Sequence, residues 1–151
     1  MAKTLFEERL QEDILIIDGA MGTMLQQEKL SPQDFGGEQY EGCNEMLNLT
    51  APHVVEKIHR AYLEAGADII ETNTFGGTAL VLNEYGLGDK ALFINQRAAE
   101  IASRLAKAYS TPDKPRFVAG AMGPTTKSLS VTGGTTFEAL TGYYAEQAKG
   151  L

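Results

Sequence analysis

The chain has 151 residues, 43% of them hydrophobic, and a formal net charge of −7. This length suffices for one ordinary hydrophobic core, and the acidic balance argues against nucleic acid as a partner, because nucleic-acid binding needs a basic patch. No apolar run approaches the roughly 20 residues of a membrane span. The first residues do not read as a signal peptide, and the single cysteine fits a reducing, cytoplasmic compartment.

The amino-terminal part predicts a short helix followed by a strand. Thr4 and Glu7 match a capping box, and the helix is expected to end at residues 12–13. The apolar residues 14–17 then predict a strand that is buried on both faces. This strand ends at Asp18-Gly19-Ala20-Met21-Gly22, an acid followed by a glycine-bracketed loop. Parallel α/β folds place ligand chemistry at the carboxyl ends of their strands, so we expect a binding site here.

The next part predicts a long helix and a second strand. Residues 24–30 indicate one or two helical turns, and the polar, aperiodic stretch from there to residue 48 is expected to be a long surface loop. A hydroxyl cap at Thr50 and a following proline open an amphipathic helix that Gly66 ends. The strand at residues 68–71 again leads into a polar, glycine-containing segment.

The last part repeats the alternation of strand and helix. A short turn at residues 78–82 precedes a long helix over about 90–109, and a third strand is expected at 117–119. A loop over 125–134 leads to a second capping box, Thr135 with Glu138. The helix that follows is expected to present one apolar face, made of Phe137, Leu140, Tyr144 and Ala148. This order predicts a parallel sheet with right-handed crossovers.

Three parallel strands do not close a barrel, which needs eight. The predicted fold class is therefore α/β, the amino-terminal portion of a (β/α)₈ TIM barrel with about three β-α units. In this interpretation residues 1–151 form a single partial barrel domain that lacks the later strands. Its open sheet edges are expected to favour self-association.

Three strand-end motifs carry a resemblance to a known family. They occupy residues 18–23, 65–75 and 120–125, and residues 44–52 and 59–62 agree with them. Together they resemble the homocysteine-binding domain of the homocysteine S-methyltransferases, most closely the cobalamin-dependent methionine synthases. The resemblance covers nearly the whole chain from residue 14 onward.

The resemblance implies methyl transfer to L-homocysteine, which gives methionine, on a barrel that holds zinc through three cysteine thiolates. Zinc and cobalamin would belong to the parent protein, with methylcobalamin and methyltetrahydrofolate bound by other domains. The family's zinc contexts, Asn-Cys and Gly-Gly-Cys-Cys-Gly, do not occur in this sequence. The zinc cysteines are therefore expected beyond Leu151. This chain alone is expected to bind no metal or cofactor, to contain no catalytic residue and to be inactive.

The same resemblance indicates which residues would bind substrate. Asp18 would hold the homocysteine ammonium, and backbone N–H groups at Gly19 and Ala20 would face the substrate. Strand-end position adds five candidates: Glu71, Thr72, Asn73, Gly123 and Thr125. Cys43 has no cysteine partner and is expected to be an incidental thiol.

Two other functions stay open from the sequence. The fold could serve a different methyl donor, namely S-methylmethionine or betaine, or a fusion to methylenetetrahydrofolate reductase. The chain could also be a non-catalytic, oligomerising module that binds an amino acid.

Overall fold

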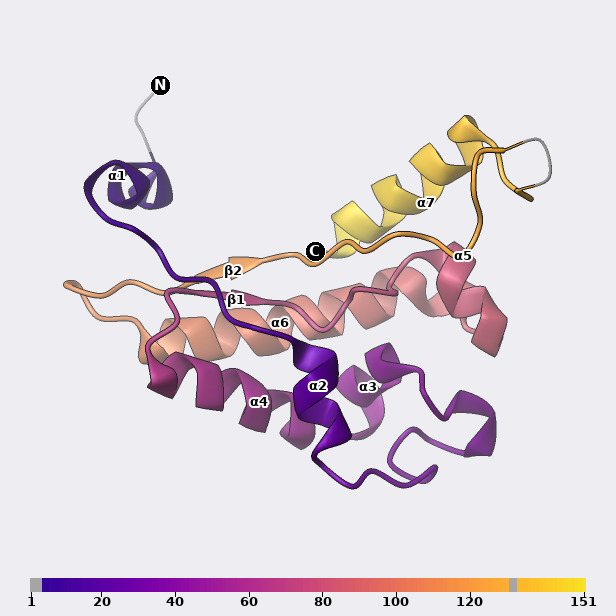
Figure 1. Ribbon diagram of the computed structural model, residues 1–151, viewed down its shortest axis with the longest axis horizontal. Helices are drawn as coiled ribbons and strands as arrows, with labels where there is room; N and C mark the ends of the chain where they lie inside the picture. Colours follow the sequence, from indigo (N-terminus) through magenta and orange to yellow (C-terminus); the bar gives the residue numbers. More distant parts are fainter. Residues whose placement is uncertain (1–3, 131–132) are drawn as a thin grey trace.

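The computed structural model describes residues 4–130 and 133–151 as alternating helices and short strands (Figure 1). The helices are α1 (Leu5–Glu12), α2 (Met21–Gln26), α3 (Leu47–Thr50), α4 (Pro52–Ala65), α5 (Ala79–Leu82), α6 (Ala91–Tyr109) and α7 (Phe137–Gly150). The strands are β1 (Ile69–Glu71) and β2 (Phe117–Ala119). Single 3₁₀ turns are η1 (Glu38–Tyr40), η2 (Asn44–Met46), η3 (Asn83–Tyr85) and η4 (Gly88–Lys90).

The sheet is parallel, as predicted. β1 and β2 pair in the register Ile69 with Phe117 and Glu71 with Ala119. Ile17 adds an isolated parallel bridge to Ile69 on the other side of β1. All three segments therefore run in the same direction, and their carboxyl ends meet at one edge. The expected α/β fold class is confirmed.

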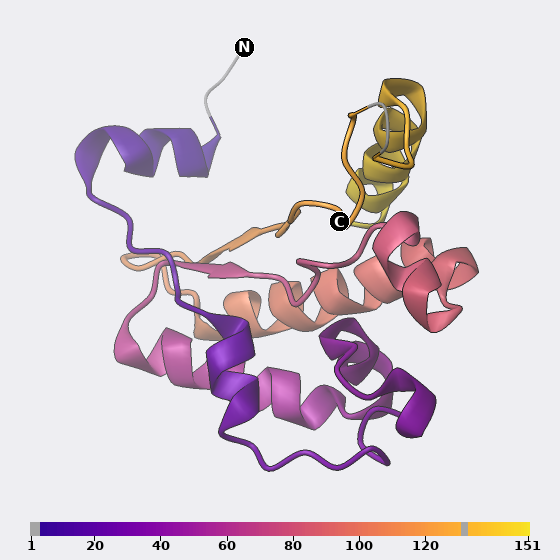
Figure 2. The same ribbon diagram turned by 45° about the vertical axis from the view of Figure 1, so that its right-hand side comes forward.

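Within the described residues α4 and α6 cover one face of this sheet, and α1 reaches β2 through an edge-to-face contact between Phe6 and Phe117. Figures 1 and 2 show α4 and α6 together beneath the strands, while α1 and α7 lie on the opposite side at the two ends of the molecule. The core between sheet and helices includes Val55 and Ile58 of α4, Ile70 of β1, and Ile101 and Leu105 of α6, each at most 3% exposed. Burial of these side chains fixes the two helices against the strands.

The predicted strand at residues 14–17 is not buried on both faces, and that expectation is wrong. Ile14 is 93% exposed, Ile16 62% and Ile17 49%. The segment bonds only to the β1 side, where the carbonyl of Ile16 accepts the N–H groups of Asp68 and Ile69. Within the described residues no helix or strand covers its other side, so its apolar residues stay exposed.

The prediction of a surface loop before residue 48 is also wrong, because much of this stretch is buried in the protein. It contains η1, η2 and the start of α3, and Phe35, Cys43 and Leu47 are each at most 7% exposed. Both η2 and α3 contact α6. The apolar residues of this stretch follow no helix or strand period, so the sequence pattern hid their burial.

The last helix begins one residue later than predicted and buries a different face. The Thr136 hydroxyl accepts the Ala139 N–H at 3.2 Å. The second half of a capping box is missing here, because alanine has no side-chain acceptor. Phe137, expected on the apolar face, is 72% exposed, whereas Gln147 and Gly150 are buried. The loop predicted before this helix includes residues 131–132, which lie outside the described residues.

We predict that His59 makes the stability of the chain depend on pH. Its side chain on α4 is fully buried, neither ring nitrogen has a hydrogen-bond partner, and burial lowers its pKa from 6.5 to about 4, opposed by Glu56. Between these values the unfolded chain binds a proton that the folded chain does not, so stability falls as the pH falls below 6.5. From pH 7 to pH 5 the free energy of unfolding should drop by about 2 kcal/mol more in the wild type than in His59→Leu.

Urea unfolding of both proteins at the two pH values measures this difference. The control is His53→Gln, which removes the exposed histidine of the same helix and should follow the wild type. A pH response in His59→Leu that equals the wild-type response would contradict the prediction.

Candidate functional site

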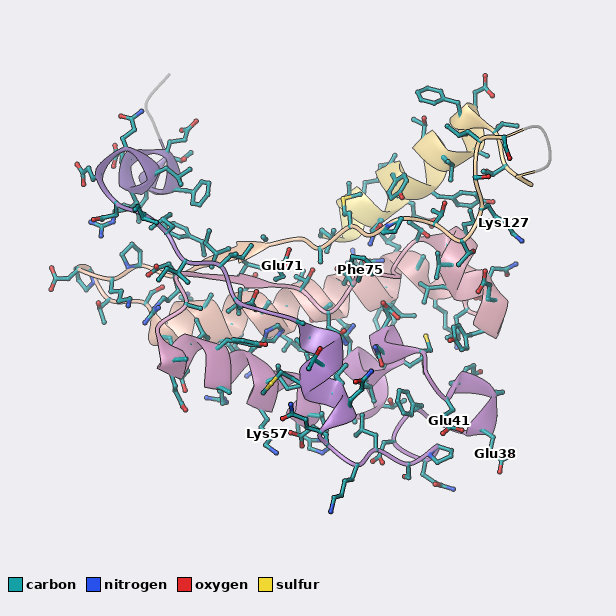
Figure 3. All side chains as sticks on the ribbon, viewed as in Figure 1. Glu38, Glu41, Lys57, Glu71, Phe75 and Lys127 are labelled. Atoms are coloured by element: carbon teal, nitrogen blue, oxygen red, sulfur yellow. The ribbon has the colours of Figure 1, made fainter. Side chains whose placement is uncertain are left out.

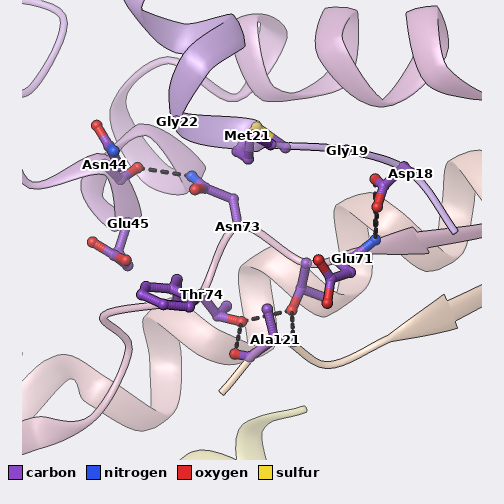
Figure 4. A pocket seen from close by; sticks show the side chains of 13 residues that line it. Asp18, Gly19, Met21, Gly22, Asn44, Glu45, Glu71, Asn73, Thr74 and Ala121 are labelled. Carbon is purple, nitrogen blue, oxygen red and sulfur yellow. Dashed lines mark hydrogen bonds between the residues drawn. The ribbon is translucent and has the colours of Figure 1, made fainter. Parts of the chain in front are cut away.

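A pocket of about 510 Å³ lies at the edge where the carboxyl ends of the strands meet (Figure 4). Segments from all three strand-end regions line it, together with two residues of η2. The lining residues are Asp18, Gly19, Ala20, Met21, Gly22, Asn44, Glu45, Glu71, Thr72, Asn73, Thr74, Phe75 and Ala121.

Asp18 is held at the pocket wall by the backbone of Glu71, the last residue of β1. Its two carboxylate oxygens accept the Glu71 N–H at 3.1 and 3.2 Å, which Figure 4 shows as a dashed contact. Burial raises the pKa of this carboxyl from 3.8 to about 6; the hydrogen bond opposes the rise and the Glu71 charge adds to it. Asp18 is therefore an anion at neutral pH, in a partly desolvated position.

A second carboxylate lies beside it. Glu71 is exposed and lines the same pocket, and Figure 3 labels it together with Phe75 on the segment that leaves β1 above α6. Phe75, 64% exposed, adds an aromatic surface to the pocket. Two acidic groups at one wall favour a cationic ligand group such as an ammonium.

The segment after Asp18 offers hydrogen-bond donors instead. α2 begins at Met21, and its N-cap residue Ala20 has no side chain that could cap the helix. The first N–H groups of any helix have no intrahelical acceptor. Met21 and Gly22 line the pocket, so their N–H groups are candidate donors to a ligand.

Gly19 allows a close approach that shapes this segment. A Cβ at this position would lie 3.0 Å from the Tyr62 Oη, which points from α4 at the Ala20 carbonyl, 3.5 Å away. A larger residue at position 19 would push the tyrosine or the loop aside.

Two threonines tie the second strand end to the third. The Ala121 N–H donates to the Thr72 hydroxyl at 3.0 Å, and the Thr74 hydroxyl donates to the Ala121 carbonyl at 2.8 Å. Because Thr74 uses its only proton there, the 2.6 Å bond between the two hydroxyls must be donated by Thr72. The bonds form a closed ring that leaves neither hydroxyl a free proton.

Asn73 and Glu45 join the pocket to η2. The side-chain amide of Asn73 donates to the backbone carbonyl of Asn44 at 2.8 Å. The backbone carbonyl of Asn73 accepts the side-chain amide of Asn48, also at 2.8 Å. The buried Glu45 carboxylate accepts the Gly76 N–H at 2.6 Å. The segment after β1 is thus bonded to η2 and α3 at both Asn73 and Gly76.

The structure gathers six of the eight predicted substrate-binding residues around one pocket. These are Asp18, Gly19, Ala20, Glu71, Thr72 and Asn73. Gly123 and Thr125 do not line it. The Gly123 N–H donates to the Phe75 carbonyl at 2.9 Å, and the Thr125 hydroxyl donates to the Lys127 carbonyl of its own loop. After Ala121 the chain leaves the pocket, so these two residues act at most through their neighbours.

Sequence reasoning did not predict seven of the lining residues: Met21, Gly22, Asn44, Glu45, Thr74, Phe75 and Ala121. Asn44 and Glu45 fall in the stretch expected to be a surface loop, and no periodic pattern marks them. An acid placed between the buried residues Cys43 and Met46 was the available signal, because a carboxylate in an apolar setting needs a partner.

The residues of this chain do not fit the zinc centre that the resemblance implies. Cys43 is 2% exposed, and burial, with the nearby Glu45 charge, raises its thiol pKa to about 11, whereas zinc binds the thiolate. Within residues 4–130 and 133–151, histidine, cysteine and acidic side chains form no group of three that could hold a metal ion. In the same residues, no helix has the length and apolar character needed to span a membrane.

Comparison with known proteins identifies relatives of the chain. The family model described as homocysteine S-methyltransferase matches residues 15–151. Methionine synthase from Mycobacterium leprae is 47% identical over 144 residues, 95% of this chain, and that from Mycobacterium tuberculosis is 45% identical over 142 residues. The chain spans about 12% of the length of each of these relatives.

Solved structures agree on the fold. The metallated form of the homocysteine methyltransferase MmuM from Escherichia coli superposes with a TM-score of 0.74 at 20% identity, over 97% of this chain and 52% of MmuM. The oxidised form of MmuM superposes with a TM-score of 0.72 at 22% identity, over 94% of this chain and 50% of MmuM. The fold is thus that of part of a homocysteine methyltransferase barrel, as predicted. With the family model matching nearly every residue, the chain belongs to the homocysteine S-methyltransferase family.

Proposed function

We propose that this chain supplies the part of a methionine synthase-type enzyme that binds the amino-acid end of L-homocysteine. One observation carries the proposal: the carboxylates of Asp18 and Glu71 line one pocket with Met21 and Gly22, the first residues of α2. An α-amino acid needs a partner for each of its charges, because its ammonium and carboxylate are joined through a single carbon.

In this function Asp18 and Glu71 attract the ammonium, and the N–H groups of Met21 and Gly22 bind the substrate carboxylate. The Glu71 N–H keeps the Asp18 carboxylate in place. Phe75 offers an apolar surface for the methylene groups of the side chain. These residues bind and orient the substrate, and none of them is assigned a proton transfer.

We assign the activation of the sulfur to residues outside this chain. The family's zinc centre needs three thiolates, and this chain has a single cysteine. Zinc, when bound, supplies a thiolate at neutral pH by lowering the thiol pKa. By resemblance to the methionine synthases, methylcobalamin is the proposed methyl donor, with cobalamin and methyltetrahydrofolate on other domains and the protein in the cytoplasm.

We predict that this chain can replace its counterpart in the Mycobacterium tuberculosis methionine synthase. The chimera should form methionine from homocysteine, because the two segments are 45% identical. Asp18→Asn in the chimera should raise KM for homocysteine about 10- to 150-fold, the range for losing a charged hydrogen bond of about 1.5–3 kcal/mol. Steady-state kinetics measure both.

The matched control is Asp13→Asn, which makes the same change at the end of α1, where the carboxylate pairs with Arg9. This variant should keep the chimera's KM. An Asp18→Asn chimera with unchanged KM would remove Asp18 from the site.

We predict that homocysteine binding weakens as the pH falls through about 6. Protonation of Asp18 at its raised pKa removes the charge that attracts the ammonium, while the ammonium and carboxylate of the ligand keep their charges. Calorimetric titration of the chain between pH 5 and pH 8 tests this. The Asp18→Asn protein should bind more weakly and show little change over the same interval; an equally steep fall in that variant would assign the effect to another group.

We predict that the 151-residue chain alone transfers no methyl group to homocysteine. Incubation with homocysteine, methylcobalamin and Zn²⁺ should give no methionine above a protein-free control, because the chain cannot supply three thiolates. Methionine formation that a chelator abolishes would overturn this prediction and the assignment of the zinc centre elsewhere.

A further inference from the structure

Two buried amides outside the pocket hold the segment after β1 that forms part of its wall. Asn95 lies on α6 and Gln147 on α7, and both side chains are 0% exposed. The Gln147 amide donates to the Thr74 carbonyl at 2.8 Å, and the Asn95 amide donates to the Gly77 carbonyl at 2.7 Å. Neither residue lines the pocket.

The side chains of these amides pack so closely against two glycines that no Cβ would fit there. A Cβ at Gly77 would lie 2.5 Å from the Asn95 Oδ1 and 2.9 Å from the Gln147 Nε2. A Cβ at Gly150 would lie 2.7 Å from the Asn95 Cβ. Two glycines therefore let α6, α7 and the pocket segment approach closely enough for the amides to reach the backbone.

Position 147 requires a hydrogen-bond donor. The Gln147 Nε2 faces three oxygens: the Thr74 carbonyl at 2.8 Å, and the Ala121 carbonyl and Asn95 Oδ1, each at 3.4 Å. An amide NH₂ has two protons to donate to these acceptors, whereas an apolar side chain would take the second donor away from the Thr74 carbonyl, which also accepts the Gly77 N–H, and a carboxylate would be repelled.

The shortest of these contacts reaches the pocket at Thr74. Thr74, whose carbonyl Gln147 holds, also closes the hydroxyl ring with Thr72 and Ala121. Thr72, Thr74 and Ala121 all line the pocket. A displaced Thr74 carbonyl would therefore move the wall between the second and third strand ends.

We propose that Gln147 and Asn95 are positioning residues that hold the 72–77 wall of the pocket in its binding geometry. The binding of homocysteine in this pocket rests on the proposed function. The role of the two amides in fixing the pocket wall is independent of it. Gln147 also joins α7 to this wall, since Gln147 and Gly150 are the buried residues of that helix.

The first experiment compares Gln147→Met with Ile94→Ala in the 151-residue chain without ligand. Methionine keeps the length of the side chain but lacks the donor, whereas Ile94→Ala opens a cavity in the apolar cluster that includes Leu82 and Leu87 and removes no hydrogen bond to the wall. Hydrogen exchange of the Thr74, Gly76 and Gly77 amides is measured against that of α4. In Gln147→Met the wall amides should exchange about tenfold faster relative to α4, the ratio expected from one lost buried hydrogen bond.

In Ile94→Ala the wall and α4 should change together. If Gln147→Met likewise speeds exchange in the wall and in α4 by the same factor, Gln147 contributes only to general stability and the proposal fails.

The second experiment uses Gln147→Glu, compared with the wild type at each pH. A protonated carboxyl can donate to the Thr74 carbonyl and an ionised one cannot. Protection of the wall amides should therefore be close to that of the wild type at low pH and be lost as the pH rises. A loss of protection that does not depend on pH would contradict a donor role.

Titration with L-homocysteine then links the wall to binding. Gln147→Met should weaken binding about tenfold, because the loss of one buried hydrogen bond corresponds to a factor of about this size. Ile94→Ala should leave the affinity close to the wild-type value. Unchanged affinity in Gln147→Met would overturn the link to the site. If the wild type does not bind homocysteine, the proposed function fails, and the exchange experiments still decide the role of the amides.

Discussion

The parallel pairing of β1 with β2 is the constraint on which the rest of the structure depends. Strands that run in the same direction place their carboxyl ends at one edge, and the bridge at Ile17 adds a third segment in the same direction. The acid after the first segment therefore meets the polar segment after the second, although 53 residues separate Asp18 from Glu71. An antiparallel arrangement of the same segments would send these groups to opposite ends of the sheet.

Burial of polar groups beyond the strand ends has a further consequence. Thr72, Asn73 and Thr74 are each at most 5% exposed, yet they lie beyond the last residue pair of the sheet, where Thr72 still donates its N–H to the Ala119 carbonyl. Buried backbone and hydroxyl groups need partners, and here those partners come from η2, α3, α6 and α7. The pocket wall is consequently fixed before any ligand arrives, which lowers the ordering cost of binding.

The sequence predicted those features that depend on local patterns. The capping box at Thr4 forms as expected, with the Glu7 N–H on the threonine hydroxyl, and Gly66 ends α4 in a left-handed conformation. Strand direction and the meeting of Asp18 with Glu71 followed from the alternation of strands and helices. Features set by distant contacts were not predictable: the exposure of Ile14 depends on which segments cover the sheet, and the burial of Gln147 depends on its reach to the Thr74 carbonyl.

On the proposed function, the three acidic residues that line the pocket, Asp18, Glu45 and Glu71, explain why amino-acid recognition and sulfur chemistry would be separate. Asp18 is partly desolvated and remains ionised at neutral pH, which suits a bound ammonium. The same acidic setting is unfavourable for a nearby thiolate: Glu45 adds to the burial that raises the Cys43 pKa to about 11. A thiol is activated by a neighbouring positive charge or metal, and a wall built to attract a cation provides the opposite field. On the proposed function, Asp18 and Glu71 would hold the ammonium, and thiolates outside this chain would hold the zinc that activates the homocysteine sulfur.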